Sequence, residues 1–374
     1  MSKPTILVTA ASGKTGTATT FQLLARGYPV RAMVHREDAR STRLREAGAD
    51  VRVGSLEDLS DLTANLTGVQ RAYFCPPLEP GTLRRATLFA TAAQSAHLEI
   101  VVALSQWVAD PLHPAVHARE KWLSNQVLQS ISKADLVVVN PGWFADNYLA
   151  GLEAAAQFGL LAMPLGEGRN APPSNEDIAR VIVGALTDPA PHIGNTYRPT
   201  GPRLLAPDEI AASFSLALDR TVEYRDAPLP LFLKVAKSLG FSDFVISQLY
   251  WFLQDYRSNA FGVGAPTDAV LGVGGSPPEP FDQIVRRYAR SSPVTARTAT
   301  AKLRAAAHLV HAALTRAPNL DALARQGINP PVDHSALAVH SPIWLNSHDP
   351  SAGHRDESGE QSDHPGLHQQ RKGQ

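Results

Sequence analysis

The 374-residue sequence predicts an α/β protein with a doubly wound parallel sheet, a smaller α+β lobe and a disordered C-terminal tail. Short runs rich in valine, isoleucine and leucine occur at residues 5–9, 29–34, 50–53, 71–75, 98–104 and 135–139, with helix-like segments between them. Strands that are apolar on both faces and alternate with helices pair in parallel through right-handed crossovers. We therefore expect the sheet in residues 1–150.

The alternation of strands and helices stops after residue 150, and residues 151–292 are predicted to form a small lobe that the first domain partly completes. Its expected helices span residues 145–158, 178–186, 208–218, 281–289 and most of 229–257, with a strand and turn over 163–168. Residues 293–348 are a predicted helical extension. Residues 349–374 are too polar to offset the entropy of ordering, so we expect a disordered tail there.

The composition excludes several classes of function. Lysine plus arginine and aspartate plus glutamate both total 35, so no net field favours direct contact with nucleic acid or an anionic membrane. The single cysteine, Cys75, excludes an intrachain disulfide and a cysteine-ligated zinc site, and we expect no metal. No apolar run approaches the ~20 residues of a membrane span, and no secretory signal opens the chain. We expect a cytoplasmic protein.

The first strand runs into a loop that suits a phosphate. Backbone N–H groups at the start of the next helix, together with the helix dipole, favour a pyrophosphate. Gly13 lets the backbone approach the phosphates and Gly16 lets the helix pack on the strand, whereas Ala10 is tolerated at the turn if its φ stays negative. The expected Rossmann-type cofactor-binding residues of this loop are Thr9, Ala10, Ser12, Gly13, Lys14, Thr15 and Gly16.

The end of the second strand indicates which dinucleotide binds. A site that prefers NAD places a carboxylate there for the ribose hydroxyls, but this stretch has none before Glu37. Arg36 could contact a 2′-phosphate in a bidentate way, and Lys14 could add a second charge. The alternative is that Arg36 is a solvated residue at the top of the sheet. We expect NADP(H) to be preferred, with NAD(H) possible.

Motifs along the chain carry a family resemblance. The loop over residues 8–16 is followed by residues 53–58, similar to a Gly-Asp-Leu-x-Asp motif in which Ser55 replaces the aspartate, and by Leu104-Ser105 at the end of the fifth strand. Residues 140–144 with Asn147 are similar to an Arg-Pro-Gly-x-Phe…Asn motif, with Asn140 in place of the arginine, and residues 174–179 and 200–202 also match. Over residues 5–290 the chain resembles the NmrA-like family of atypical short-chain dehydrogenases/reductases.

This resemblance implies an NAD(P)(H)-binding domain and a lobe that forms a cleft over the nicotinamide. Further cofactor contacts are then expected from Ser55, Leu56, Cys75, Pro76, Lys121, Asn140 and Pro141. The family contains reductases of quinones, dyes and similar molecules, and also proteins that bind the nucleotide without turnover.

Short-chain dehydrogenases use a serine after the fifth strand and a tyrosine four residues before a lysine. Ser105, His117 and Lys121 take these places, with histidine in place of tyrosine. Lys121 could hold the ribose or be a surface lysine, and Ser105 could be catalytic or a hydrogen-bonding residue at the strand end. His117 could donate a proton or line a pocket.

Aromatic side chains after the strand ends suggest the substrate. Trp107, Trp143 and Phe144, with Asn147, are expected either to bind a flat substrate or to pack against the second lobe. Because a quinone can take its protons from solvent, the missing tyrosine favours an NAD(P)H-dependent oxidoreductase acting on a planar conjugated molecule. The alternative is a non-catalytic NADP(H)-binding redox sensor. The expected partner is a small-molecule substrate, and a homodimer or a regulatory protein partner remains open.

Overall fold

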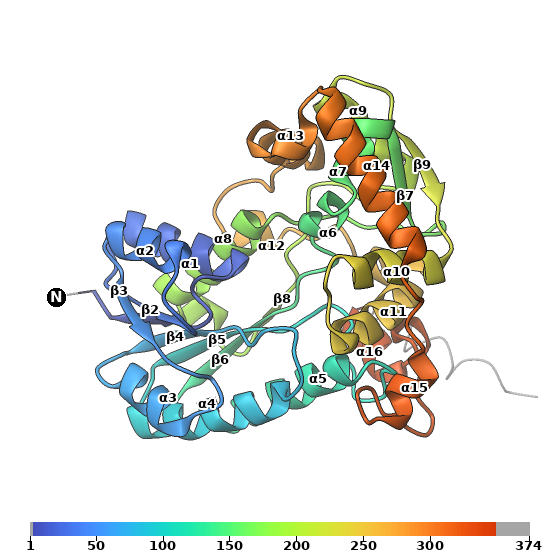
Figure 1. Ribbon diagram of the computed structural model, residues 1–374. Helices are drawn as coiled ribbons and strands as arrows, with labels where there is room; N and C mark the ends of the chain where they lie inside the picture. The colour runs from blue at the N-terminus through green and yellow to red at the C-terminus, as the bar shows by residue number, and fades with distance from the viewer. Residues whose placement is uncertain (1–2, 349–374) are drawn as a thin grey trace, which may run out of the picture.

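A computed structural model describes residues 3–348, and a seven-stranded parallel sheet forms the centre of its first domain (Figure 1). The strand order is β3-β2-β1-β4-β5-β6-β8, as the doubly wound prediction requires. The strands are β1 (Ile6–Val8), β2 (Val30–Val34), β3 (Asp50–Val53), β4 (Arg71–Phe74), β5 (Ile100–Leu104), β6 (Asp135–Val139) and β8 (Thr196–Tyr197). The α/β fold class is confirmed, and the predicted tail lies outside the described residues.

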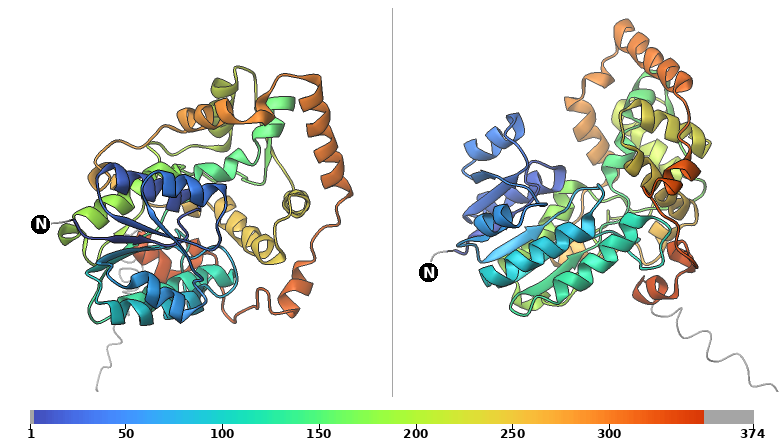
Figure 2. Two further views of the ribbon diagram at one scale, coloured as in Figure 1. Left: turned by 60° about the vertical axis from the view of Figure 1, so that its left-hand side comes forward. Right: turned by 60° about the horizontal axis from the view of Figure 1, so that its bottom comes forward.

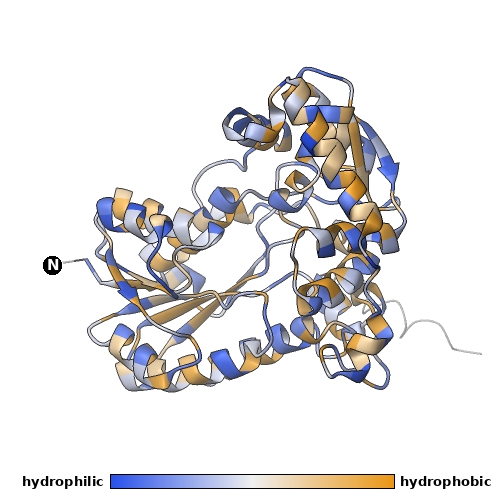
Figure 3. Cartoon of the chain, viewed as in Figure 1, coloured by the Kyte–Doolittle hydropathy of each residue, from blue (hydrophilic) through white to orange (hydrophobic). Residues whose placement is uncertain are grey.

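Helices cover both faces of the sheet. One face carries α1 (Lys14–Ala25), α2 (Ala39–Glu46) and α8 (Asn175–Thr187), and the other carries α3 (Leu59–Leu66), α4 (Thr82–Ala96) and α5 (Val116–Gln129) (Figure 1). Ile6 and Val8 pack in the cluster that contains residues of α1 and α8, whereas Leu7 packs in the cluster that contains residues of α3 and α4. This alternation explains why the strand is apolar at every position (Figure 3).

The second lobe is built around a two-stranded parallel sheet of β7 (Leu160–Met163) and β9 (Glu223–Asp226). Its helices are α6 (Ala145–Leu149), α7 (Leu152–Phe158), α9 (Pro207–Leu218), α10 (Leu229–Ser238), α11 (Asp243–Arg257) and α13 (Phe281–Ser291). The short helix α12 (Ala269–Gly272) packs with α8 against the first domain. The single helix predicted over 145–158 is wrong, because the chain breaks it at Gly151. A Cβ at Gly151 would lie 2.8 Å from Leu161 Cδ1, so the break lets the chain pack closely on β7.

The extension beyond residue 293 runs along the second lobe and returns to the first domain (Figure 2). It contains α14 (Ala299–Leu314), α15 (Leu320–Arg325) and α16 (Pro342–His348). Trp344 Nε1 donates to Trp107 O at 2.8 Å, and Ser341 Oγ donates to the buried Asp110 Oδ2 at 2.6 Å. The extension therefore holds the two lobes together. None of the described helices combines the length and apolarity needed to cross a bilayer.

Candidate active site

The β1–α1 loop forms the phosphate end of the site. Gly13 is the N-cap of α1, no side chain caps the helix, and no acidic residue lies in its first turn. The N–H groups at this helix start are therefore available to an anion. A Cβ on Gly16 would collide with the carbonyl oxygen of Ala10 and lie 2.9 Å from the Cα of Ala11, so the loop folds back on the helix through this glycine.

Ala10 departs from the sequence-based expectation, because its φ is +47° and not negative. The left-handed conformation crowds the Cβ of an alanine, and glycine adopts it more readily. The turn is kept because Gly13 N donates to Ala10 O at 2.8 Å and Ala11 N donates to Met33 O at 3.0 Å. The neighbouring strand and the turn thus hold Ala10 in a conformation that the sequence alone disfavours.

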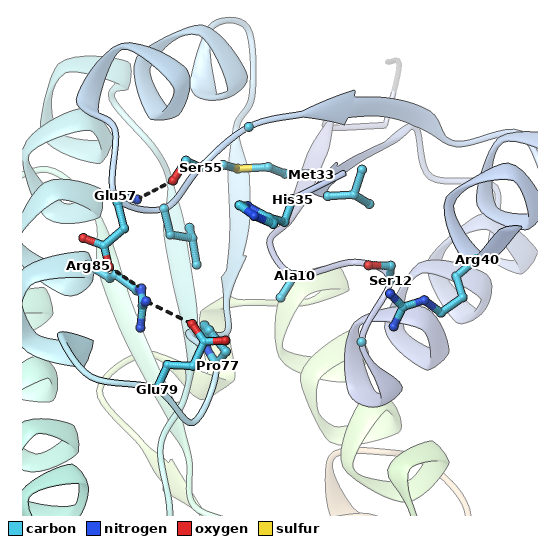
Figure 4. A pocket seen from close by; sticks show the side chains of 14 residues that line it. Ala10, Ser12, Met33, His35, Arg40, Ser55, Glu57, Pro77, Glu79 and Arg85 are labelled. Carbon is cyan, nitrogen blue, oxygen red and sulfur yellow. Dashed lines mark hydrogen bonds and ion pairs between the residues drawn. The ribbon is translucent and has the colours of Figure 1, made fainter. Parts of the chain in front are cut away.

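A cavity of about 380 Å³ opens beside the loop, at the carboxyl ends of β1, β2 and β3 (Figure 4). Ser12 and Gly13 form its phosphate side, and Leu56 and Pro77 contribute apolar walls. Across from Arg40, a chain of ion pairs joins Arg85 to Glu57 at 2.7 Å and to Glu79 at 3.1 Å. The glycine cradle, the uncapped helix start and the apolar walls fit the adenosine half of a dinucleotide.

The arginine beside Ser12 in this cavity is not the expected one. Arg36 is exposed and does not line the cavity, whereas Arg40, in the first turn of α2, lies on the same side as Ser12 (Figure 4). Asp38 caps α2 and accepts from Arg40 Nη2 at 2.6 Å, which holds the guanidinium and lowers the pKa of the Asp38 carboxyl to about 2. The spacing of Asp38 and Ser41 is a capping box that could have indicated where α2 begins.

Lys14 lies away from this cavity. Its Nζ is 2.6 Å from Oδ2 of Asp146 in α6, so it joins the phosphate loop to the second lobe and does not line the cavity as a second charge for a 2′-phosphate. The Asp146 side chain is 6% exposed, and Lys14 supplies its counter-ion. The contact places α6 next to the start of α1.

Lys121, from α5, occupies the carboxyl end of β5. Its Nζ donates to Leu104 O at 2.7 Å, and burial lowers the pKa of the amine from 10.5 to about 8, although the nearby Cys75 opposes the shift. Cys75 N donates to Thr9 Oγ1 at 2.8 Å, and Cys75 Sγ lies 3.8 Å from Thr15 Oγ1. The structure thus gathers Lys121, Cys75 and Thr15 from three separate elements, while the buried Thr9 ties β1 to β4.

His117 is not placed as an acid. Its side chain is buried, its Nδ1 lies 3.1 Å from Thr82 Oγ1, and its backbone N–H donates to Gln248 Oε1 at 2.9 Å. Burial, and then the positive charges of Lys121 and Arg85, hold the pKa of His117 well below its usual range. The neutral imidazole joins α4, α5 and α11, and it is a weak proton donor at neutral pH.

Ser105 and the aromatic residues have mostly internal partners. Ser105 Oγ accepts from Asn125 Nδ2 at 3.0 Å. Trp107 is 1% exposed and its Nε1 donates to Ala260 O at 2.9 Å, while Trp143 is 5% exposed and packs edge-on against Tyr256. These two tryptophans belong to the core of the second lobe and present no face to a substrate, because the lobe packs over them.

The remaining residues that were expected to contact the cofactor or the substrate lie in several different places. Ser55 and Leu56 line the adenosine cavity, where Pro77 appears in place of the buried Pro76. Pro141 is buried beside Trp107, and Asn140 lines a different pocket near α16. Phe144 and Asn147 are partly exposed at α6. Five residues that no sequence motif indicated also line the cavity: His35, Arg40, Glu57, Glu79 and Arg85.

Comparisons with known proteins agree with this geometry. A family model described as NAD(P)H-binding matches residues 10–189. The chain is 30% identical over 285 residues to NAD(P)H azoreductase of Xenophilus azovorans, covering 76% of this chain and 95% of that enzyme. It is 25% identical over 245 residues to quinone oxidoreductase 2 of Escherichia coli strain K12, covering 64% and 83%. The crystal structure of NmrA, a negative transcriptional regulator in complex with NADP, matches at a TM-score of 0.64 and 16% identity, over 79% of this chain and 100% of that one.

The chain belongs to the NmrA-like family of atypical short-chain dehydrogenases/reductases and is an NAD(P)H-dependent oxidoreductase. The family resemblance and the nucleotide cofactor expected from the motifs are therefore confirmed. The likeness to the regulator, at 16% identity, is a likeness of fold.

Alanine substitution should weaken NADPH binding more at Gly16 than at Gly13. Gly16→Ala forces its Cβ into Ala10 and Ala11, whereas a Cβ on Gly13 would lie 3.1 Å from Ala10 O and needs only a small shift. We expect Gly16→Ala to weaken NADPH binding by about tenfold or more, or about 1.4 kcal/mol, and Gly13→Ala to weaken it less. NADPH fluorescence titration checks this, with circular dichroism as the control for folding. Equal losses would contradict the close approach at Gly16.

Lys121 should make stability depend on alkaline pH. Below pH 8 the amine is charged in both states, but between about pH 8 and 10.5 the folded amine loses its proton while the unfolded one keeps it. The unfolded state then binds more protons, so the free energy of unfolding rises with pH in this window. The pKa difference between 10.5 and about 8 corresponds to about 3 kcal/mol, at about 1.4 kcal/mol per pH unit.

Urea unfolding of the wild type and of Lys121→Met across this range tests that expectation. The wild type should gain stability relative to the variant as pH rises. The exposed Lys133 provides the control, because Lys133→Met should follow the wild type. A difference between wild type and Lys121→Met that stays flat from pH 7 to 10.5 would show that the amine has an ordinary pKa.

Proposed function

We propose that the protein uses NADPH to reduce planar, conjugated acceptors of the quinone type. The observation that carries the proposal is that His117, at the position of the family's proton-donating tyrosine, is buried, neutral and hydrogen-bonded to Thr82. A ketone needs a proton from the protein as its alkoxide forms, whereas a reduced quinone can take protons from solvent. The site therefore suits an acceptor of the second kind.

In this proposal the residues of this chain bind and orient the dinucleotide and the acceptor. The uncapped start of α1 and Gly13 hold the pyrophosphate, and the charged Lys121, fixed by Leu104 O, holds a ribose hydroxyl. The dinucleotide, when bound, supplies the hydride. Lys14 and Asp146 keep α6 and Phe144 against the phosphate loop, so Phe144 and Asn147 are the substrate contacts that we retain from the sequence prediction.

The named activities of the two relatives support the same class of acceptor. An azo group and a quinone are both flat and conjugated, as the proposed acceptors are. A non-catalytic NADP(H) sensor is the alternative, and it requires that the cofactor bind tightly without turnover.

We assign the choice of NADP(H) over NAD(H) to Arg40 and not to Arg36. Arg40 lines the adenosine cavity beside Ser12, and Asp38 orients its guanidinium through Nε and Nη2, which leaves Nη1 free of this pair. A guanidinium in this place can bind the 2′-phosphate by a charge-assisted hydrogen bond.

A screen of NADPH oxidation tests the proposed reaction. Menadione and methyl red should be reduced at least about a hundredfold faster than cyclohexanone, since general acid catalysis contributes about 10²–10⁴-fold to a reaction that needs it. His117→Gln keeps a neutral hydrogen-bonding side chain and should leave the kcat for menadione within about threefold. Tight NADPH binding without turnover of any acceptor would favour the sensor. Ketone reduction that is lost in His117→Gln would make His117 the proton donor.

Paired arginine variants test the cofactor assignment. Arg40→Ala should weaken NADPH binding by about tenfold and leave NADH binding unchanged, because only NADPH carries the 2′-phosphate. Arg36→Ala is the matched control and should change neither, since Arg36 lies outside the cavity. Dissociation constants for both nucleotides, measured by fluorescence titration, give the result. A loss confined to Arg36→Ala would restore the sequence-based assignment.

A further inference from the structure

A second pocket lies at the far edge of the sheet from the adenosine cavity and shares no lining residue with it. It has a volume of about 200 Å³ and is enclosed by α5, the ends of β6 and β8, and α16. This volume equals that of about seven water molecules at about 30 Å³ each. The pocket is therefore large enough for a small organic molecule.

The pocket contains a positive charge that has no counter-ion within residues 3–348. Arg198 follows β8 and is partly buried, its Nη2 donates to Ser347 O at 2.7 Å, and its Nε is buried without a partner. No carboxylate among residues 3–348 lies within ion-pair distance of this guanidinium. Burial lowers the pKa of Arg198 from its usual value, as expected where charge is removed from water without compensation. An anion in the pocket would supply the missing partner.

Two acceptor atoms beside Arg198 also lack partners. Asn140 is 8% exposed, and its Oδ1 is buried without a hydrogen bond. His348 Nδ1 lies 2.8 Å from Ser347 Oγ and 3.0 Å from Trp344 O, and Nε2 is buried without a partner among the described residues; in the tautomer with the hydrogen on Nδ1, Nε2 is an acceptor. Burial and the charge of Arg198 lower the pKa of His348 to about 3, so the ring stays neutral. The pocket thus offers one cationic donor and two acceptors.

We propose that this pocket binds a small hydroxylated carboxylic acid. The carboxylate pairs with Arg198, and the hydroxyl group donates to Asn140 Oδ1 or His348 Nε2, which meets the unpartnered groups with a single ligand. Trp122, which is partly exposed, provides an aromatic wall for the rest of the molecule, which favours a ring. The hydroxybenzoates combine these features in about ten non-hydrogen atoms, a size suited to the volume.

The pocket is connected to the candidate active site by one side chain. Asn125 lines the pocket and its Nδ2 donates to Ser105 Oγ at 3.0 Å. A ligand in the pocket therefore lies next to the residue that orients Ser105. The proposal also gives Asn140 a role that it does not have in the cofactor cavity.

Calorimetric titration of the full chain with 4-hydroxybenzoate tests the proposal, with benzoate and phenol as partial probes. We expect 4-hydroxybenzoate to bind at least tenfold more tightly than benzoate, which lacks the hydroxyl donor, and phenol to give no measurable heat. Asn140→Leu should bring the affinity for 4-hydroxybenzoate down to about that for benzoate. Arg198→Gln should abolish the binding of both acids.

Two further variants separate binding from folding and from general charge effects. Arg286 is exposed and has no side-chain partner among the described residues, so Arg286→Gln removes one positive charge elsewhere and should leave binding unchanged. Arg198→Gln should melt at or above the wild-type temperature without ligand, because it removes an uncompensated charge. The proposal would be overturned if 4-hydroxybenzoate did not bind, or if phenol bound as tightly as 4-hydroxybenzoate. It would also be overturned if Arg286→Gln weakened binding as much as Arg198→Gln does, or if Arg198→Gln left binding intact.

Discussion

Removal of water from the side chains between α4, α5 and α11 is the constraint on which the chemistry of this protein depends. Burial lowers the pKa of Lys121 to about 8 and keeps His117 neutral, and the positive charges of Lys121 and Arg85 act on His117 in the same direction. The result is a site with a fixed, charged lysine and no acid at the place of the family's tyrosine. Such a site is consistent with the proposed acceptors, which need no proton from the protein.

This burial is produced by parts of the chain that are far apart in sequence. Gln248 and Phe244, from α11, cover His117, and Asn329 in the extension accepts from the N–H of Val116 at the start of α5 at 2.7 Å. The second lobe and the extension therefore do more than enclose a cleft, because they set the protonation of residues in the first domain. A change in the extension that loosens these contacts would let water reach His117 and raise its pKa.

Local rules predicted the six strands β1–β6 and the phosphate loop, since strand burial and the close approach at Gly16 depend on neighbouring residues only. The seventh strand, β8, lies beyond the range 1–150 predicted for the sheet. The prediction assigned the 2′-phosphate to Arg36 and did not name Arg40, because the directions of both side chains depend on where α2 begins, which Asp38 decides. Trp107 looked like a substrate wall, but its partner Ala260 lies 153 residues away, and no local pattern indicates that contact. The state of His117 likewise depends on a partner from the second lobe.

Kinetic isotope effects on menadione reduction test the central claim most directly. If the protein supplies no proton, the rate should fall with deuterium in the transferred position of NADPH, stay the same in D₂O, and show no dependence on the protonation of His117 between pH 6 and 8. A solvent isotope effect of about two or more that disappears in His117→Gln would contradict the account, because it would place a proton from His117 in the rate-limiting step.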